Sequence, residues 1–421
     1  MGYRYLVVWI LAIVYTLNFL DRQIVAILAE SIRKDLDLTD AQLGMLGGIA
    51  FAAFYTTFGL PVAWLADRTN RVRVIAASCG LWSLFTVLCG TATNFVQLAF
   101  YRMGVGVGEA GGSPPSYSLI SDYFPPAKRG TALALYSLGV PMGAMMGAFV
   151  GGRVAEAFGW RTAFYAMGLP GIVMAVVLLL IVREPKRGVM DAMEHGATEH
   201  EKAPPLFSAI GAFFKQRTLV LVAISSALSA FVGNAALNWN PPFLIRVKGM
   251  TLGDVATYYA LILGVTGMIG TFGSGWLVDR LARRNRRWFA WLPAITLATT
   301  IPFWVGIILA PTWQMTLAFI AIPALLGNTY LAPALTVVQN AVSPNRRTVS
   351  GAVLLFILNL VGLGIGPVYV GTISDWAKPQ YGDNSLSVGF AALIPIIVLS
   401  IGAHLAVAWS IGQDVKRAAR A

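Results

Sequence analysis

Four ionisable residues lie inside long apolar stretches of this 421-residue chain, at Asp21, Arg22, Arg102 and Glu109. An ionised side chain inside a bilayer costs about 2.5 to 3.5 kcal/mol on insertion scales, so each of these charges needs a partner or water. Arg102 and Glu109 are seven residues apart, which puts them on one helix face about 10.5 Å apart along the axis. Because that is too far for direct pairing, we predict that Asp21 pairs with Arg102 and Arg22 with Glu109.

Such a network could carry protons. A carboxylate whose proton affinity depends on a nearby arginine and on access of water can bind a proton in one conformation and release it in another. Alternatively, the ion pairs only lock two helices together. Ionisable residues within a membrane are functional by default, so the sequence favours proton coupling.

The composition indicates a membrane protein with many crossings. Hydrophobic residues make up 57% of the chain and charged residues 12%, whereas a soluble protein carries about 25% charged residues. At about 20 residues per spanning helix, the chain has room for about twelve crossings. The net charge of +12 comes from short basic clusters between apolar runs, which is typical of cytoplasmic loops and argues against a nucleic-acid partner.

We therefore predict an all-α integral membrane protein of twelve transmembrane helices in two six-helix bundles, with both termini cytoplasmic. The bundles comprise residues 1–183 and 218–411; a cytoplasmic linker with a surface helix at 206–214 occupies 184–217, and a basic cytoplasmic tail occupies 412–421. The expected spans are 5–29, 41–66, 73–92, 96–121, 130–156, 161–182, 218–244, 253–278, 289–309, 313–339, 348–374 and 386–411.

The two halves of the chain repeat each other. The sequence Trp64-Leu65-Ala66-Asp67-Arg68 recurs 212 residues later as Trp276-Leu277-Val278-Asp279-Arg280, and Pro126-Ala127-Lys128-Arg129 recurs after 218 residues as Pro344-Asn345-Arg346-Arg347. Parallel repeats of this kind imply two homologous bundles related by a pseudo-two-fold axis along the membrane normal.

Two sets of motifs point to a family. Gly59, Asp67, Arg68, Arg71 and Arg73 resemble the loop between the second and third helices of the major facilitator superfamily, although Asn70 stands where a glycine is usual. Within that superfamily, Asn18-Phe19-Leu20-Asp21-Arg22 and the segment from Arg102 to Ala110 resemble the spinster branch. The resemblance implies a lipid substrate, and it implies a part in proton-linked switching for Asp21, Arg102 and Glu109.

The resemblance also implies a set of gating residues. By this resemblance, Asp67 caps the cytoplasmic start of the eleventh helix and pairs with Arg129, which would latch the outward-facing state. The cap is physically reasonable because an aspartate is favoured at a helix N-terminus. The full expected gating set is Gly59, Asp67, Arg68, Arg71, Arg129, Asp279 and Arg280.

Glycines supply a second structural pattern. Gly139, Gly143, Gly147 and Gly151 recur every fourth residue, which predicts close helix packing, with or without a gating role. The alternating glycines from Gly104 to Gly108 lie inside a predicted span, so they indicate packing rather than a dinucleotide site.

Polar and aromatic residues within the spans are candidates for a substrate cavity: Asn18, Asn234, Asn238, Trp239, Tyr258, Asn328, Tyr330 and Asn359. The second half has almost no charge in its spans, whereas the first offers Arg22 and Arg102. This division suits an amphiphile with an anionic head and an apolar tail.

The first functional hypothesis is a proton-coupled secondary transporter that works by alternating access and moves a lysophospholipid or a sphingosine-1-phosphate-like lipid. The alternative is a proton-coupled symporter of small organic anions such as sugar acids, a branch that the first-helix Asp-Arg also resembles. A receptor without transport is a further reading. An enzyme is disfavoured because the chain has no Ser/His/Asp constellation, metal-ligand spacing or nucleotide motif.

No catalytic residue, cofactor or metal is expected. Cys79 and Cys89 lie ten residues apart on one predicted helix, where they point in different directions and cannot form a disulfide. The expected partners are the amphiphilic substrate, protons and membrane lipids, and no nucleic acid. A monomer is expected, and the short loops favour a bacterial inner (plasma) membrane.

Overall fold

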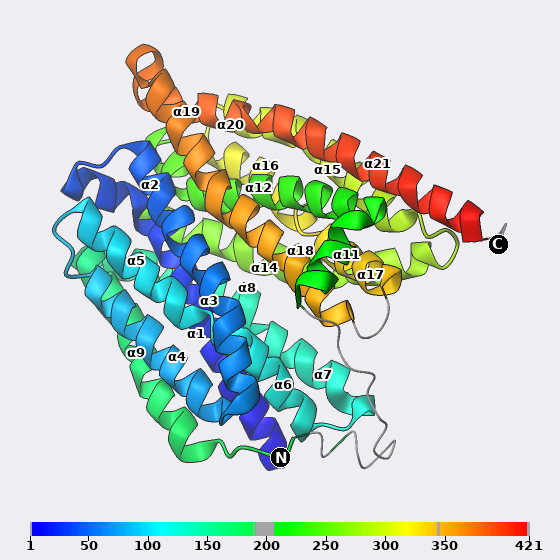
Figure 1. Cartoon of the computed structure of the whole chain (residues 1–421). Coiled ribbons are helices and arrows are strands. Elements are labelled where there is room, and N and C mark those ends of the chain that lie inside the picture. The colour runs from blue at the N-terminus through cyan, green and yellow to red at the C-terminus, as the bar shows by residue number, and fades with distance from the viewer. Residues whose placement is uncertain (1, 188–189, 191–205, 343–345, 419–421) are drawn as a thin grey trace. The chain divides into compact units, whose positions relative to one another are not determined.

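The computed structural model describes residues 2–187, 190, 206–342 and 346–418 (Figure 1). The chain divides into two compact units: unit 1 is Met1–Glu199 with Met250–Gly264, and unit 2 is His200–Gly249 with Val265–Ala421. Within the described residues all regular elements are helical. Much of the predicted linker, 188–189 and 191–205, lies outside the described residues, as does the end of the predicted tail, 419–421.

Unit 1 is built from the first nine helices and a short segment from later in the chain. These elements are α1 (Tyr3–Leu36), α2 (Asp40–Gly47), α3 (Ile49–Arg68), α4 (Arg71–Cys89), α5 (Phe95–Glu109), α6 (Ser113–Tyr123), α7 (Pro126–Ser137), α8 (Gly139–Phe158), α9 (Trp160–Ile181), α13 (Leu252–Asp254) and the π-helix η1 (Val255–Tyr259).

Unit 2 contains the remaining helices. They are α11 (Leu206–Lys215), α12 (Arg217–Arg246), α14 (Ala260–Ala282), which starts in unit 1, α15 (Trp288–Leu309), α16 (Trp313–Leu326), α17 (Leu331–Ala341), α18 (Arg347–Ile357), the π-helix η3 (Leu358–Ile365), α19 (Gly366–Tyr381), the 3-10 helix η4 (Gly382–Asn384), α20 (Ser385–Ala391) and α21 (Leu393–Ala418).

Ten described helical stretches are long and apolar enough to cross a membrane. One of them, Val349–Gln413, has 65 residues, about three times the length that one crossing needs, and the 3-10 helix η4 interrupts it. The stretch 95–123 is not among the ten; it carries Arg102 and Glu109 and is broken between α5 and α6. The count of twelve crossings and the cytoplasmic location of the termini stay predictions.

Several spans that the sequence predicts as continuous are broken. The predicted span 96–121 divides at Ala110–Gly112 into α5 and α6, and the predicted span 313–339 divides at Gly327–Tyr330 into α16 and α17. The two breaks lie in equivalent places of the repeat, about 218 residues apart. In the first of them two glycines weaken the helix and the next helix has Pro114 and Pro115 in its first turn, where proline is favoured.

Glycines allow α8 to approach α1 closely. A Cβ atom at Gly139 would lie 2.9 Å from the backbone oxygen of Ala12, and one at Gly147 would lie 2.7 Å from that of Leu20. Unit 2 repeats the arrangement, because a Cβ atom at Gly366 would lie 2.6 Å from the backbone oxygen of Phe231. The close packing predicted for Gly139 to Gly151 is therefore present in unit 1, unit 2 has an equivalent seam, and a gating role for these glycines stays a prediction.

The glycines of α5 also allow neighbouring helices to pack closely. A Cβ atom at Gly106 would lie 2.6 Å from the backbone oxygen of Phe51 on α3, and one at Gly108 would lie 2.8 Å from the Cα atom of Trp82 on α4. This packing holds the charged residues of α5 against two neighbouring helices.

The first sequence repeat recurs as an equivalent contact in each unit. The guanidinium carbon of Arg68 lies 4.0 Å from the ring centroid of Trp64, and that of Arg280 lies 5.6 Å from the ring centroid of Trp276. Both tryptophans are largely exposed, as expected for aromatic residues near a membrane surface.

The second sequence repeat also forms an equivalent contact in each unit. Arg129 donates from Nη2 to the backbone oxygen of Ser121 at 2.9 Å, and Arg347 donates from Nε to that of Gln339 at 3.0 Å. Each arginine reaches back eight residues, to the end of the preceding helix. The repeats thus build equivalent local structures.

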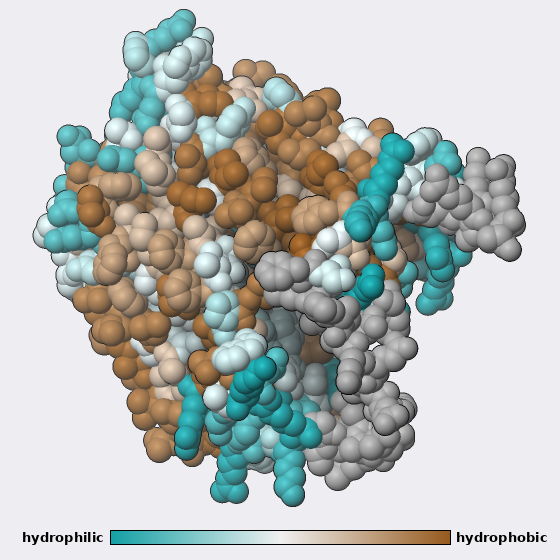
Figure 2. Space-filling model, viewed as in Figure 1, coloured by the Kyte–Doolittle hydropathy of each residue, from teal (hydrophilic) through white to brown (hydrophobic). Residues whose placement is uncertain are grey.

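The outer face of unit 1 is apolar. Leu169, Val173, Val176 and Leu180 follow one another at helical spacing on α9, and each is more than half exposed. Figure 2 shows hydrophobic side chains gathered over α4, α5 and α9, with hydrophilic side chains at the helix ends. An exposed apolar band of this kind is a surface for lipid.

Candidate functional site

The predicted ion pair between α1 and α5 is present. Arg22 donates from Nε to Oε2 of Glu109 at 2.6 Å, and the side chain of Glu109 is fully buried while that of Arg22 is 20% exposed. Glu109 is the last residue of α5, so the break that follows it fixes where its carboxylate lies. The pair joins α1 to α5.

The predicted pair between Asp21 and Arg102 is not formed. Within the described residues, Oδ2 of Asp21 accepts a hydrogen bond from Oγ1 of Thr86 at 3.1 Å, and Nε of Arg102 donates to the backbone oxygen of Leu46 at 3.5 Å. Leu46 lies in the last turn of α2, where carbonyl groups lack intrahelical partners. The break between α2 and α3 therefore offers Arg102 a neutral acceptor that the sequence pattern did not indicate.

Both buried carboxyl groups have one oxygen without a protein partner. Oδ1 of Asp21 and Oε1 of Glu109 are buried and accept no hydrogen bond within the described structure, and the same holds for Oδ1 of Asn18 on the same side of α1. A buried carboxylate oxygen without a donor is costly, whereas a protonated carboxyl group carries no charge. One oxygen of each carboxyl group is therefore left without a hydrogen bond in the described structure.

Arg22 lies among aromatic rings. Its guanidinium carbon is 4.7 Å from the ring centroid of Phe19, 5.1 Å from that of Phe51 and 4.6 Å from that of Tyr55. Glu109 accepts from Nε, and the Tyr55 side chain also interacts with the guanidinium. The two terminal amino groups are donors in a planar fork, which suits a carboxylate or phosphate.

A tyrosine cluster adjoins this arginine. Tyr15 and Tyr136 stack with centroids 4.3 Å apart and an interplanar angle of 6°, and Tyr117 meets Tyr136 edge-on at 5.2 Å. Tyr15 also packs edge-on against Phe19 at 5.1 Å. Sequence reasoning missed these rings, although Tyr15, Phe19 and Arg22 are spaced to share one face of a helix.

The predicted cavity residues of the second half lie on several elements, and a shared substrate cavity stays a prediction. Nδ2 of Asn234 donates to the backbone oxygen of Ala230 at 2.8 Å, and Nε1 of the buried Trp239 donates to that of Pro367 at 2.8 Å. Tyr330 is buried and lines a small cavity. Asn328 is exposed in the break before α17, Asn238 and Asn359 are half-buried, and the exposed Tyr258 belongs to unit 1.

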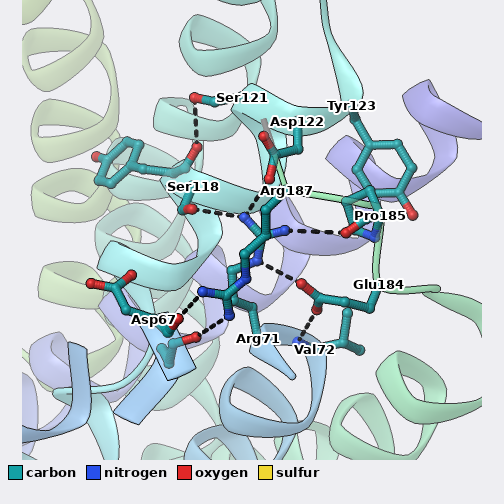
Figure 3. Close-up of polar contacts among 12 residues, drawn as sticks. Asp67, Arg71, Val72, Ser118, Ser121, Asp122, Tyr123, Glu184, Pro185 and Arg187 are labelled. Carbon is teal, nitrogen blue, oxygen red and sulfur yellow. Dashed lines mark hydrogen bonds and ion pairs between the residues drawn. The ribbon is translucent and has the colours of Figure 1, made fainter. Parts of the chain in front are cut away.

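Arg71, predicted as a gating residue, is the buried first residue of α4, and its gating role stays a prediction. Its guanidinium forms ion pairs with Asp122 at 2.6 Å and Glu184 at 2.7 Å, and donates to Oγ of Ser118 at 2.8 Å (Figure 3). The side chain is only 2% exposed. It joins the start of α4 to the end of α6 and to the segment after α9.

That segment, residues 182–187, crosses the ends of several helices. Arg187 donates to the backbone oxygens of Ala66, Thr69 and Asp67 at the C-terminus of α3 (Figure 3). The positive charge suits the carbonyl end of a helix. Sequence reasoning missed this role for Arg187.

Tyrosine hydroxyls hold the same segment. The hydroxyl of Tyr123 donates to the backbone oxygen of Arg183 at 2.5 Å, and the hydroxyl of Tyr3 donates to that of Ile181 at 2.7 Å. The start of the linker is therefore fastened to unit 1.

Asp67 and Arg129 do not pair in this structure, and their pairing in the outward-facing state stays a prediction. Asp67 is exposed, and its carboxylate makes no ion pair within the part of the chain that the structure describes, while Arg129 donates to the end of α6. Asp279 is likewise exposed, and Gly59 has open space where a Cβ atom would be. No group of three or more metal-ligating side chains occurs among the described residues.

Comparison with known proteins identifies the family. The profile of the Major Facilitator Superfamily matches residues 11–367. The chain is 32% identical to an MFS-type efflux pump of Mycolicibacterium smegmatis, over 93% of this chain and 89% of that one, and 26% identical to the hexuronate transporter of Bacillus subtilis, over 91% of each.

A solved structure agrees with this assignment. The structure of a bacterial homologue of the human lysosomal transporter spinster, in an inward-facing and unoccupied conformation, is 31% identical to this chain, with a TM-score of 0.87 and 98% of each chain covered. The chain therefore belongs to the major facilitator superfamily of membrane transporters and, within it, resembles the spinster proteins.

Proposed function

We propose that this protein is a proton-coupled secondary transporter, working by alternating access, for an amphiphilic lipid with an anionic headgroup, such as a lysophospholipid or a sphingosine-1-phosphate-like molecule. The observation that carries the proposal is the buried pair of Arg22 and Glu109, in which the glutamate holds the guanidinium through Nε alone and keeps one oxygen, Oε1, without a hydrogen-bond donor in the described structure.

This arrangement gives a simple route to coupling. Glu109 as a carboxylate holds Arg22 through Nε. When Glu109 takes up a proton, it loses its charge and its hold on the guanidinium weakens. Arg22 is then free to bind an anionic headgroup, so binding of a proton and binding of substrate favour each other.

Asp21 and Arg102 offer a second proton site in the same unit. Among the described residues, the hydroxyl of Thr86 is the one hydrogen-bond donor to Asp21, so the carboxyl group of Asp21 accepts a proton without breaking an ion pair. Arg102, with no carboxylate within ion-pair distance in the described structure, stabilises a negative charge on either acid through space.

The lipid assignment is supported by the surroundings. The three rings around Arg22 give its charge an apolar frame, and the spans of the second half are nearly free of charge. If the headgroup bound Arg22, the apolar tail of the lipid would lie against these aromatic rings and uncharged spans. The likeness to a spinster homologue points the same way.

The alternative substrate class is a small organic anion, such as a sugar acid. The likeness to a hexuronate transporter favours it, and so do the tyrosine rings beside Arg22, whose faces and hydroxyls suit a sugar. Both substrate classes would bind the same arginine, so a transport assay with a substrate of each class is needed to distinguish them.

The test is uptake into proteoliposomes of a labelled lysophospholipid, with outer-leaflet lipid removed by albumin, in parallel with a labelled hexuronate. Arg22→Gln should lower uptake at least about tenfold, because a hydrogen bond to a charged group contributes about 1.5–3 kcal/mol. Arg33→Gln is the control, since Arg33 pairs with Glu30 on its own helix. Uptake of the hexuronate alone would establish the alternative, and uptake of neither would refute both.

A further inference from the structure

One end of unit 2 carries an excess of positive charge. Residues 279–291, which join α14 to α15, contain five arginines and one acidic residue, Asp279, and residues 206–218 contain Lys215 and Arg217 and no acidic residue. None of these basic side chains forms an ion pair with another residue that the structure describes. Uncompensated basic residues at the end of membrane-spanning helices attract anionic lipid headgroups.

Two of these arginines contact the last turns of α21. The guanidinium carbon of Arg217, at the start of α12, lies 4.6 Å from the ring centroid of Trp409. The guanidinium of Arg287, just before α15, lies directly on Gly412, where a Cβ atom would be 2.5 Å from its Nε. Trp409 and Gly412 are three residues apart, so they are neighbours on the surface of one helix. Arginines from two separate elements therefore reach adjacent places on α21.

A buried hydrogen bond fixes the start of α12 at this place. The hydroxyl groups of Thr218 and Ser410, the residues that follow Arg217 and Trp409, lie 2.6 Å apart and are both buried. The indole ring covers one face of the Arg217 guanidinium, whereas the N–H groups lie at its edge. Such a planar fork of donors matches the oxygens of a phosphate group.

An apolar face leads away from these arginines along α21. Its exposed residues follow one another at spacings of three and four, as on one side of a helix: Pro395, Val398, Gly402, Leu405 and Trp409. A Cβ atom at Gly402 would meet nothing within 4 Å, so the face is hollowed there. A soluble anion would use only the basic end of this surface, whereas a phospholipid would use both the basic end and the apolar face.

We propose that Arg217, Arg287 and Trp409 form a binding site for an anionic phospholipid on the outer surface of unit 2. The two guanidinium groups bind the headgroup phosphate, and an acyl chain lies along the exposed face of α21. The site belongs to unit 2, whereas Arg22 belongs to unit 1. The inference is therefore independent of what the protein transports.

The experiment measures which lipid lies beside α21. In a background with Cys79→Ala and Cys89→Ala, the variant Leu405→Cys carries a bimane fluorophore one turn before Trp409, in nanodiscs of phosphatidylcholine. A small fraction of phosphatidylglycerol or of phosphatidylcholine carries a nitroxide quencher on its acyl chain. The quenching should show an enrichment of phosphatidylglycerol of about fivefold or more, since each arginine near an anionic headgroup contributes about 1 kcal/mol. Arg217→Gln combined with Arg287→Gln should lower the enrichment below about twofold.

Three controls separate a specific site from general attraction. Arg283→Gln combined with Arg284→Gln removes the same charge from two exposed side chains and should keep most of the enrichment. A bimane at Leu169→Cys, on the exposed apolar face of α9, should be quenched equally by the two lipids. Arg22→Gln should leave the enrichment beside α21 unchanged, because Arg22 serves the proposed transport substrate.

Equal quenching by the two lipids at residue 405 would overturn the lipid site. An equal loss of enrichment in the two double variants would also overturn it, because net charge alone would then attract the lipid. If millimolar inorganic phosphate displaced the labelled phosphatidylglycerol, the site would bind a free anion and the assignment to a phospholipid would be wrong. A protein that transports neither tested substrate would refute the proposed function and leave this result standing.

Discussion

Replacing Arg71 with alanine should destabilise unit 1 strongly. Arg71 is 2% exposed and holds Asp122, 9% exposed, and Glu184, 21% exposed. Removing one partner of a buried ion pair costs about 3–5 kcal/mol, because the other charge stays buried. Because Glu184 is partly exposed to water, we expect a loss of stability at the lower end of this range, about 3 kcal/mol. For a unit of about 200 residues this corresponds to a fall in melting temperature of about 6 to 12 °C.

The assay follows the exposure of Cys79 and Cys89 to a thiol-reactive fluorogenic dye during heating. Both cysteines are fully buried on α4, the helix that Arg71 begins. The exposed Arg73 supplies the matched control, Arg73→Ala. Arg71→Lys should fall between the two, because an ammonium group keeps the charge but cannot bridge two carboxylates as a guanidinium does. The reasoning is refuted if Arg71→Ala melts within about 2 °C of Arg73→Ala.

Three further predictions concern single residues. Asp21→Asn should leave the protein folded, since an amide oxygen still accepts from Thr86, but its proteoliposome flux should no longer respond to pH; an unchanged pH response removes Asp21 from the coupling mechanism. Gly143→Ala should lower the melting temperature by several degrees, because its methyl group meets the backbone of α1 and overpacking costs about 1–3 kcal/mol. Gly151→Ala should leave the melting temperature unchanged, because the nearest atom to its added methyl group, Cγ1 of Ile24, lies 3.4 Å away. Equal falls in melting temperature for the two variants would contradict the tight packing of α8 on α1 at Gly143. Burial lowers the pKa of Lys248 below its usual 10.5, so the unfolded chain binds this proton more tightly and the free energy of unfolding rises with pH between the lowered pKa and 10.5. In Lys248→Met this rise in stability should be absent. The check is to measure the melting temperatures of the unmodified protein and of the variant at several alkaline pH values; a difference between them that does not change with pH would show the reasoning to be wrong.

Features repeated along the chain could be predicted from the sequence. The duplicated Trp64 and Arg68 motif, for example, indicated two homologous halves, and each half forms the same cation-π contact. The pairing of Arg22 with Glu109 could also be predicted, because a buried charge has few partners available and both lie within apolar stretches.

The partner of Arg102 could not be predicted in the same way. It depends on a backbone carbonyl of Leu46 that is available because α2 ends at Gly47, and the apolar pattern across 41–66 shows no such break. A break in a helix leaves little trace in hydropathy, since glycine is common within spans.

Arg71 and Arg187 illustrate a second limit. Basic residues between apolar runs are read as solvated loop residues, yet Arg71 is buried and Arg187 binds the end of α3. Their partners come from segments about 50 to 120 residues away in sequence, and one chain without its fold gives no sign of such long-range contacts.

The central claim is that proton movement drives substrate movement through Glu109. The most direct measurement is uptake of labelled lysophospholipid into proteoliposomes, with and without an imposed pH gradient, for the unmodified protein and Glu109→Gln. The account predicts gradient-dependent uptake that the variant loses while it stays folded. Gradient-dependent uptake that persists in Glu109→Gln would contradict it.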